Sequence, residues 1–468
     1  MNAECDDGMR ARAAAAMRAL ASWAAGPEAR RAPQAVQDRA AIILMDDLGA
    51  MVAGGAEPQV VQTTARLGRS SGPAEATIFA RGAARFDRAT AATANGMAAA
   101  WCELDEGYRL APCHAGAYLL PALLAEGEAE GSSVGDILEA LIIAYEVTTR
   151  MARAFPFGTP ITVHPHAAFA AIGAAAAVSA LRRHGPRQML DSLSGAASMA
   201  FAGPFRHAVE GALVRNAWTA AGAWAGLRAA DWAEAGIGGL AETAHDVFVG
   251  SFRTGCDPAH LTDRLGETWG VLDGYHKIFA CCQYTHSALE SVLALHRRPG
   301  ARDRLHGIEE IVVETHPLGL ALTTVEPATI LAAKFSMPHA VAATTLLGTG
   351  GQDAFASLTL ADAEIAALRR RVRLEPYGAV GAPPNDRPAR VTWRFRDGTA
   401  WTEACESARG GADQPFDPPT LATKFRENTQ AVFPAMPQAM ATIVAGEAAS
   451  RARSWTDTVR IMTGKDGA

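Results

Sequence analysis

The chain has 468 residues, of which 49% are hydrophobic and 20% are charged, and its formal net charge is −6. This length exceeds what one ordinary core accommodates, so we expect a globular protein of two or three domains. The net negative charge argues against a nucleic-acid partner, because such proteins usually carry a basic surface. A small anionic ligand would therefore need positive charge from residues close to its site.

The first ten residues, MNAECDDGMR, are acidic where a secretory signal has a basic start and an apolar core. No stretch approaches the roughly 18 uninterrupted apolar residues of a membrane span. We therefore expect a cytoplasmic protein without a membrane partner. Seven cysteines, an odd and small number, predict reduced thiols, and without a CxxC motif we expect no metal site.

From residue 11 to about residue 271, alanine and leucine recur at three- and four-residue spacing, interrupted by Gly or Pro. This periodicity predicts successive packed helices, whose small side chains allow the helix axes to approach closely. The clearest predicted helices are Gln34–Gly54, Val134–Phe155, Ala167–Arg183 and Leu213–Ala235.

The pattern changes after Lys277, where segments become β-branched or alternate apolar with polar residues. Strands are predicted at Ile308–Thr315, Arg371–Glu375 and Val391–Arg396, the last followed by an Asp397-Gly398 hairpin turn. Helices are predicted between them at Ser287–Leu295, Met337–Leu347 and Ala361–Arg370. A helical pattern returns after Pro419.

We therefore predict a mainly α fold with two parts. Both chain ends, residues 1–272 and 406–468, would form a large all-helical domain. A smaller α+β lid domain would be inserted at residues 273–405. The cleft between the domains is where we expect a ligand, because clefts of this kind are common ligand sites.

The densest polar cluster is WCELDEGYRLAPCH, residues 101–114, between a helix-prone segment and an apolar one. It contains Glu103, Asp105, Glu106 and His114. Burial and nearby like charge move the pKa of a carboxyl group toward neutrality, which suits an acid or a base. The alternative is a solvated loop that joins two helices, with glycine and proline as turn residues.

Two further candidates lie in helical surroundings. His164 precedes Pro165 at the start of an alanine-rich helix, where free amides attract anions. It is a candidate acid, base or carboxylate anchor, or simply a helix cap. Arg215 lies among apolar residues in GALVRNAW, where it would either hold a ligand carboxylate bidentately or form an internal ion pair.

The segment DGYHKIFACCQYTH, residues 273–286, spans the predicted domain boundary and contains Lys277, Cys282 and His286. Lys277 is a candidate carboxylate anchor, or a proton carrier if burial lowers its pKa, and a surface lysine is the common alternative. In AAKFSMPHAVA, Ser336 is a candidate helix cap, and His339 is a candidate proton carrier or a core histidine.

The chain contains neither a glycine-rich phosphate loop nor a GxSxG nucleophile motif. Carboxylates, histidines and cations without a cofactor motif suit proton abstraction next to a carboxylate, followed by loss of a β-substituent. We therefore expect no cofactor and a small carboxylate as substrate.

Taken in order, these segments resemble the MmgE/PrpD family, over residues from about Ala15 to Arg460. The markers are ANGMAAAWCELDEGYR with CHAG, VHPHAAFAAIGAAAA, VRNAWTAAGAWAGLRAA, YHKIFACCQYTH, AAKFSMPHAVA, and the late DGTAW with PPTLATKFREN. The family includes 2-methylcitrate dehydratase, cis-aconitate decarboxylase and iminodisuccinate epimerase. The resemblance implies a cofactor-free homodimer, small di- or tricarboxylate substrates, and an active site between a helical domain and a lid.

By motif, the resemblance implies pocket residues at Glu103, Asp105, Glu106, His114, His164 and Lys277. Other positions depart from the family pattern. ELDEG stands where well-studied members have Asp-Phe-Asp-Asp-Thr. Arg215 occupies a lysine position, Trp218 and Cys282 occupy histidine positions, and His339 occupies a tyrosine position. Because arginine keeps its proton at neutral pH, Arg215 can anchor a carboxylate but cannot exchange a proton.

We predict a lyase, with dehydration of a small β-hydroxy di- or tricarboxylate as the leading reaction. Epimerisation or decarboxylation of a similar substrate is the alternative, and a non-catalytic carboxylate-binding homologue is the alternative from another class. In this hypothesis Arg215 and Lys277 bind carboxylates, and His164 or His339 moves a proton. Asp105 and Glu103 orient or protonate the leaving hydroxyl with help from His114. The predicted binding site also includes Glu106, Cys282 and His286.

Overall fold

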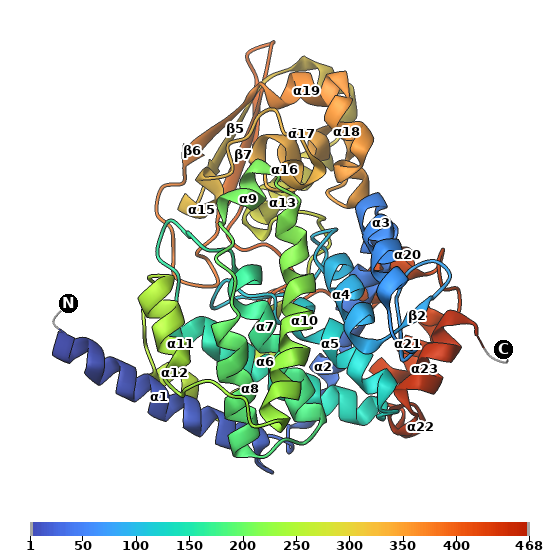
Figure 1. The fold of residues 1–468 in the computed structure, drawn as a ribbon. Coiled ribbons are helices and arrows are strands. Elements are labelled where there is room, and N and C mark those ends of the chain that lie inside the picture. Colours follow the sequence, from blue (N-terminus) through green and yellow to red (C-terminus); the bar gives the residue numbers. More distant parts are fainter. Residues whose placement is uncertain (1–2, 466–468) are drawn as a thin grey trace.

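Helices form most of the computed structural model, which describes residues 3–465 and their side chains from residue 7 (Figure 1). The helices of the first part are α1 (Ala3–Ala25), α2 (Gln34–Gly54), α3 (Pro58–Leu67), α4 (Arg88–Ala99), α5 (Ala115–Ala129), α6 (Val134–Ala154), α7 (Pro165–Leu181), α8 (Pro186–Ser198), α9 (Arg206–Glu210), α10 (Val214–Glu234), α11 (Thr243–His245) and α12 (Ala259–Thr262). Helices α2, α6, α7 and α10 confirm the four clearest predictions from periodicity.

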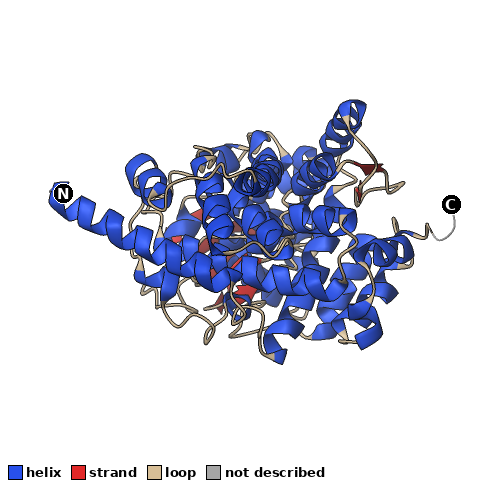
Figure 2. Cartoon of the chain, turned by 60° about the horizontal axis from the view of Figure 1, so that its bottom comes forward, coloured by secondary structure: helices blue, strands red, loops and turns tan. Residues whose placement is uncertain are grey.

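Helix α7 lies at the centre of this helical body. It contacts α5, α6, α8 and α10, and nearly all of its side chains are buried. Its residues are apolar or small on every side, which is the pattern of a helix enclosed by others. Figure 2 shows how helices dominate the outline of the molecule, with the strands partly hidden behind them.

One mixed four-stranded sheet forms the second part, at the top of Figure 1. Its strands are β5 (Ile308–Thr315), β6 (Val372–Pro376), β7 (Ala389–Phe395) and β8 (Ala400–Cys405), in the order β6-β5-β7-β8. The β5/β6 pair is parallel and the other two pairs are antiparallel. The three strands predicted from alternation are confirmed as β5, β6 and β7, and the Asp397-Gly398 turn joins β7 to β8.

Helices cover this sheet and connect its strands. They are α13 (His286–His296), α14 (Ala301–Arg304), α15 (Pro317–Leu320), α16 (Ile330–Lys334), α17 (Met337–Leu347), α18 (Ser357–Ala361) and α19 (Ala363–Arg369). The helix predicted at residues 361–370 is present as α19, which begins two residues later. Asp362 ends α18 and caps α19, because its carboxylate accepts hydrogen bonds from the amides of Glu364 and Ile365.

The C-terminal helices pack against helices from the first part of the chain. They are α20 (Pro418–Thr429), α21 (Met436–Val444), α22 (Ala448–Ala452) and α23 (Trp455–Thr463). Helices α20 and α21 contact α2, and α23 contacts α5 and α6. Among the described residues, no helix is long and apolar enough to cross a membrane.

Two pairs of very short strands complete the fold. The first joins β1 (Ala76–Thr77) to β2 (Arg85–Phe86), and the second joins β3 (Gly107–Tyr108) to β4 (Gly274–Tyr275). The β3/β4 pair fastens the acidic segment 101–114 to the segment 273–286. Two-residue strands carry too little alternation to be predicted from sequence.

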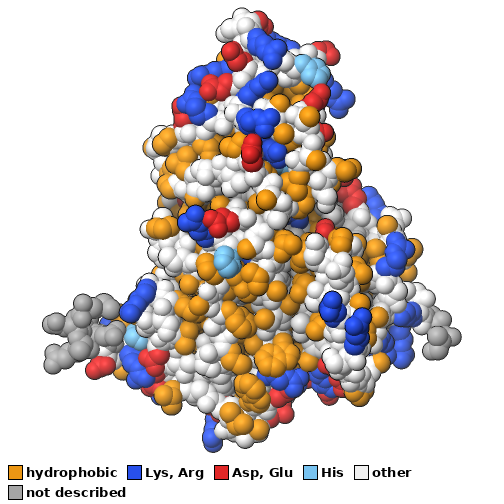
Figure 3. All heavy atoms as spheres, turned by 45° about the horizontal axis from the view of Figure 1, so that its top comes forward, with side chains coloured by type: hydrophobic (Ala, Val, Ile, Leu, Met, Phe, Trp, Pro, Cys, Tyr) orange, Lys and Arg blue, Asp and Glu red, His pale blue; other side chains and the backbone are white. Residues whose placement is uncertain are grey.

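Exposed apolar side chains collect along α10 and the segment after it. Val214, Trp224, Trp232 and Ile237 are between 38% and 62% exposed. Figure 3 shows apolar side chains running down this face of the helical body, whereas charged side chains are dense on the sheet-containing part. Contiguous exposed apolar surface of this kind is typical of contact sites.

Candidate active site

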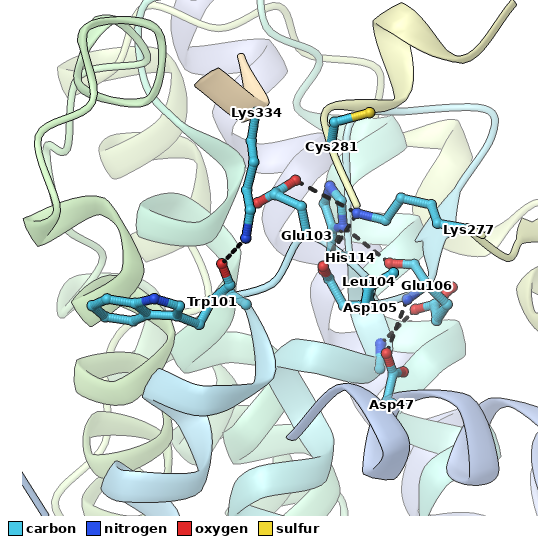
Figure 4. Close-up of polar contacts among 12 residues, drawn as sticks. Asp47, Trp101, Glu103, Leu104, Asp105, Glu106, His114, Lys277, Cys281 and Lys334 are labelled. Carbon is cyan, nitrogen blue, oxygen red and sulfur yellow. Dashed lines mark hydrogen bonds and ion pairs between the residues drawn. The ribbon is translucent and has the colours of Figure 1, made fainter. Parts of the chain in front are cut away.

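A buried loop carries the acidic cluster. Residues 100–114 connect α4 to α5, and Glu103, Asp105 and Glu106 within them are at most 2% exposed. The alternative of a solvated connection is therefore wrong (Figure 4). Glu103 has a backbone φ of +55°, a left-handed conformation that is uncommon for residues other than glycine and that marks local strain.

Two cations neutralise two of these carboxylates. Arg215 Nη1, from α10, lies 2.5 Å from Glu103 Oε1. Lys277 Nζ lies 3.5 Å from Glu103 Oε2 and donates a 3.2 Å hydrogen bond to Asp105 Oδ1. Figure 4 shows Lys277 reaching toward both carboxylates. Arg215 and Lys277, predicted to hold substrate carboxylates, thus hold carboxylates of the protein itself.

These pairs keep the four groups charged. Burial alone would raise the pKa of Asp105 and Glu103, but Lys277 and His114 hold the pKa of Asp105 well below its usual range, and Arg215 and Lys277 lower that of Glu103. Burial alone would lower the pKa of Lys277, but Asp105 and Glu103 raise it above its usual value. Lys277 is therefore poorly suited to carry a proton, and the two carboxylates are poorly suited to donate one.

His114 combines an orienting carboxylate with access to a cavity. Its Nδ1 lies 2.7 Å from Asp105 Oδ2 and 3.0 Å from the carbonyl oxygen of Glu106. Both neighbours are acceptors, so Nδ1 carries a hydrogen and Nε2 of the neutral ring is an acceptor. A carboxylate in this position fixes the tautomer and stabilises the imidazolium that forms when Nε2 takes a proton.

His164 begins α7, where its Nδ1 accepts a 3.2 Å hydrogen bond from the amide of His166. Arg215 Nε lies 3.3 Å from His164 Nε2. Burial, and after it the charge of Arg215, lowers the pKa of His164 well below its usual range, so the ring is neutral at neutral pH. His164 therefore caps the helix, which was one of the two interpretations of this residue from the sequence. It also lines the cavity.

The cavity lies against these residues and, with its mouth, encloses about 470 Å³. It is lined by Glu103, Tyr108, Pro112, Cys113, His114, His164, Pro165, Phe205, Arg215, Tyr275, Cys282, Gln283, Tyr284, Phe335 and Arg387. Asp105 and Lys277 lie directly behind this lining, in contact with His114 and Glu103.

Five predicted site residues do not line the cavity: Asp105 and Lys277 lie behind its wall, and the others are Glu106, His286 and His339. Glu106 accepts hydrogen bonds from the amide of Gly116 (2.7 Å) and the hydroxyl of Tyr145 (2.8 Å), and burial raises its pKa to about 7. His286 Nε2 lies 3.3 Å from the carbonyl oxygen of Cys281. These contacts make both residues parts of the interior, because their polar atoms already have protein partners.

His339 lies in the sheet-containing part. Its Nε2 is 3.1 Å from the carbonyl oxygen of Ala354, and its Nδ1 is 3.0 Å from Arg369 Nη1. Ser336 caps the same helix, α17, as predicted, by accepting a hydrogen bond from the amide of His339. His339 is one of the buried polar residues of this part, both of its ring nitrogens have protein neighbours, and it is not among the residues that line the cavity.

The cavity also contains residues that sequence reasoning missed. Tyr275 and Arg387 line it, and His166 lies behind it between His114 and His164, with ring centroids 5.0 and 4.5 Å away. His166 was visible in the VHPH motif, and Tyr275 in the boundary segment. Arg387 follows a proline-rich loop, and no motif in the sequence around it indicated a residue of the site.

The backbone of the acidic loop fits closely around Tyr275. A Cβ added to Gly107 would lie 2.3 Å from the Tyr275 hydroxyl oxygen, so only glycine allows β3 to pass beneath that ring. Among residues whose side chains are described, no three His, Cys, Asp or Glu side chains are grouped as metal ligands are. Cys102, Cys113, Cys281, Cys282 and Cys405 are free thiols, and Cys5 lies outside the described side chains.

Fold and site together define a mainly helical protein in which histidine, arginine and carboxylate side chains meet at a small cavity. Residues 18–259 match the MmgE/PrpD N-terminal domain, and residues 279–448 match the MmgE/PrpD C-terminal domain. The chain belongs to the MmgE/PrpD family, which confirms the resemblance found in its sequence.

Two relatives are enzymes or enzyme-like proteins by name. A cis-aconitate decarboxylase-like protein of Aspergillus oryzae is 24% identical over 433 residues, covering 87% of this chain and 88% of that protein. A cis-aconitate decarboxylase of Aspergillus terreus is 25% identical over 303 residues, covering 60% of this chain and 60% of that enzyme.

Proposed function

We propose that this protein is a lyase that acts on a small di- or tricarboxylate, with His114 as the residue that moves the proton. The observation that carries the proposal is the 2.7 Å contact between Asp105 Oδ2 and His114 Nδ1 at the edge of the cavity. A histidine held in this way presents Nε2 to a substrate and alternates between neutral and charged forms.

The charged residues around His114 have supporting roles in this proposal. Asp105 stabilises the imidazolium form, and Lys277 keeps Asp105 ionised. Glu103 and Arg215 form the neighbouring pair and shape the wall of the cavity. His164, neutral and 3.3 Å from Arg215, is the candidate for a second polar contact with the substrate.

Decarboxylation is the reaction that we place first. His114 first takes a proton from solvent at Nε2. The bond from a substrate carbon to its carboxylate then breaks, CO2 leaves, and the electron pair left on that carbon takes the proton from the His114 imidazolium, which becomes neutral again. One proton carrier is sufficient for this sequence. The names of the two relatives support it, whereas the sequence alone had favoured dehydration.

Dehydration is the second candidate, because His114 and His164 both line the cavity. His114 would take the proton from carbon and then, as imidazolium, donate it to the hydroxyl that leaves as water, while the neutral His164 would contact the substrate. Epimerisation uses the same first step, with a proton returned to the opposite face of the carbon.

Turnover in heavy water distinguishes these reactions. The wild-type protein is incubated with cis-aconitate, citrate, 2-methylcitrate and amino-dicarboxylates, while CO2, alkene absorbance and deuterium in recovered substrate are measured. CO2 identifies decarboxylation, a new alkene without CO2 identifies dehydration, and deuterium with an inverted stereocentre identifies epimerisation. Binding without any product would instead identify a non-catalytic homologue.

The His114→Gln variant tests the assigned residue. We expect a rate reduced at least 10²-fold, because a positioned acid–base group contributes about 10²–10⁴-fold. The matched control is His306→Gln, a substitution of an exposed histidine in the sheet-containing part, which should leave the rate unchanged. A His114→Gln variant with the wild-type rate would remove His114 from the mechanism.

A cytoplasmic homodimer is part of the proposal, as the resemblance and the N-terminal composition imply. The exposed apolar strip of Val214, Trp224, Trp232 and Ile237 is the surface that a second copy would best cover. Light scattering of wild-type protein and of Trp224→Glu tests this: a monomer in the wild type would exclude the dimer, and an unaffected dimer in the variant would exclude this surface.

A further inference from the structure

Arg387 stands apart from the other cations at the cavity. It follows an exposed loop between β6 and β7, yet its side chain is buried, with only 7% of the residue exposed. It lines the cavity beside Gln283 and Tyr284, and its guanidinium carbon lies 5.1 Å from the centre of the Tyr284 ring. A polycarboxylate in the cavity would therefore meet this guanidinium.

A contact between Arg387 and a ligand carboxylate matters because the other charges at the cavity already balance one another. Glu103 and Asp105 contribute two negative charges, and Arg215 and Lys277 contribute two positive charges in direct contact with them. This group is neutral in sum, so it leaves no cation free for an anionic ligand. A ligand with two or three carboxylates needs positive charge from elsewhere.

A second charged group at the cavity supplies this positive charge. Asp386 pairs with Arg109, which donates to both carboxylate oxygens, one at 3.2 Å and the other in a shorter contact. The remaining contact, between Asp386 Oδ2 and Arg387 Nε, is 3.5 Å long. Two arginines thus share one carboxylate, and the excess of one positive charge lies at the cavity wall.

The guanidinium of Arg387 also has unused donors. Its Nη1 donates to the amide oxygen of Gln283, but its buried Nε has no hydrogen-bond partner among the described residues. A guanidinium presents five N–H donors in a planar fork that matches a carboxylate. A buried donor without an acceptor is destabilising, so a ligand oxygen would be bound favourably here.

We infer that Arg387 binds one carboxylate of the substrate and so determines specificity for polycarboxylates over monocarboxylates. This inference rests on the proposed function, because it assumes that the cavity binds such a molecule. The group formed by Glu103, Asp105 and their two cations is neutral in sum, whereas Arg387 attracts a ligand carboxylate. The substrate is thereby oriented, with one carboxylate at Arg387 and the reacting carbon near His114.

The test uses propane-1,2,3-tricarboxylate, a saturated tricarboxylate that has no hydroxyl to lose, with butyrate as the monocarboxylate comparison. Calorimetric titration gives the affinity of wild type, Arg387→Gln and Arg387→Lys. We expect at least a tenfold weaker Kd for the tricarboxylate with Arg387→Gln and an intermediate value with Arg387→Lys, which keeps the charge but loses the fork. Butyrate, with a single carboxylate, should bind wild type more weakly than the tricarboxylate does.

Arg390→Gln is the matched control, because Arg390 lies on β7 and pairs with Glu314 away from the cavity lining. It should bind the tricarboxylate as wild type does. Equal affinity in wild type and both Arg387 variants would overturn the inference and leave the proposed function standing. No binding of any polycarboxylate to wild type would overturn both. With a substrate that is turned over, Arg387→Gln should raise KM more than it lowers kcat.

Discussion

The ammonium group of Lys424 donates a 2.7 Å hydrogen bond to the carbonyl oxygen of Leu104, and so joins α20 to the acidic loop. The same Nζ lies 2.6 Å from Asp46 Oδ1, and Asp46 Oδ2 lies 2.7 Å from His276 Nδ1. Leu104 precedes Asp105 in the chain, and His276 precedes Lys277. One buried network therefore supports both partners of the Lys277–Asp105 ion pair.

Replacement of Lys424 by methionine should destabilise the protein by about 3–5 kcal/mol, because it leaves the buried carboxylate of Asp46 without its cation. Urea unfolding measures this change. Lys465→Met is the control: Lys465 donates only to the carbonyl oxygen of Ala83 near the surface, so a loss of about 1 kcal/mol is expected. A loss below 1 kcal/mol in Lys424→Met would show that the network is not structural.

Gly116 should not tolerate alanine. Its Cβ would lie 1.7 Å from Asp47 Oδ2 and 3.1 Å from Glu106 Oε1, so two buried carboxyl groups would have to move. We expect a loss of about 3 kcal/mol or failure to fold, measured by thermal and urea unfolding. Gly158→Ala, with no heavy atom within 4 Å of the added Cβ, should change stability by no more than about 0.5 kcal/mol.

Stability should depend on pH through Glu106. Burial raises the pKa of Glu106 to about 7 from its usual value of 4.5, so the folded protein binds this proton more tightly than the unfolded chain. The stabilisation is complete below about pH 4.5, is lost as pH rises toward 7, and is absent above. Asp47, whose pKa burial and Glu106 raise well above its usual range, acts in the same direction.

Glu106→Gln removes this dependence. The free energy of unfolding of the variant relative to wild type should increase by on the order of 3 kcal/mol between pH 4.5 and 8. Urea unfolding at several pH values measures the difference, with Glu326→Gln as an exposed control. Parallel curves for wild type and Glu106→Gln would contradict the prediction.

Asp105→Asn should lower kcat by about 10²–10⁴-fold while the protein stays folded. The amide cannot stabilise the imidazolium of His114 as the carboxylate does. Steady-state kinetics on whichever substrate is turned over gives the value, and Asp397→Asn in the exposed hairpin turn is the control. If Asp105→Asn kept more than a tenth of the wild-type kcat, the assigned orienting role would be wrong.

The Glu103–Arg215 pair should show strong coupling. Arg215→Met alone leaves Glu103 with only Lys277 and should destabilise by about 3–5 kcal/mol, whereas Glu103→Gln combined with Arg215→Met should lose less than the sum of the single changes. A double-mutant cycle by urea unfolding measures the coupling, expected at about 1–3 kcal/mol. Additive changes would mean that the contact contributes nothing specific.

Local pattern predicted the helices and main strands well. Periodic apolar residues located α2, α6, α7 and α10, and alternation located β5, β6 and β7, because the spacing of side chains reflects which face is buried. Local pattern did not locate the boundary between α18 and α19, because that boundary is set by a single residue, Asp362. It also missed β3 and β4, which exist only because two distant segments meet.

The sequence by itself determined the fold class, the family and the position of the acidic loop, since these depend on short-range patterns and ordered motifs. Only the tertiary structure decided which charges face the cavity. Lys277 and Asp105 are 172 positions apart, and their contact turns a predicted substrate anchor into a partner of the protein's own carboxylates. Arg387 shares the carboxylate of Asp386 with Arg109 for the same reason: charge pairing follows distance in space, which no local pattern of residues encodes.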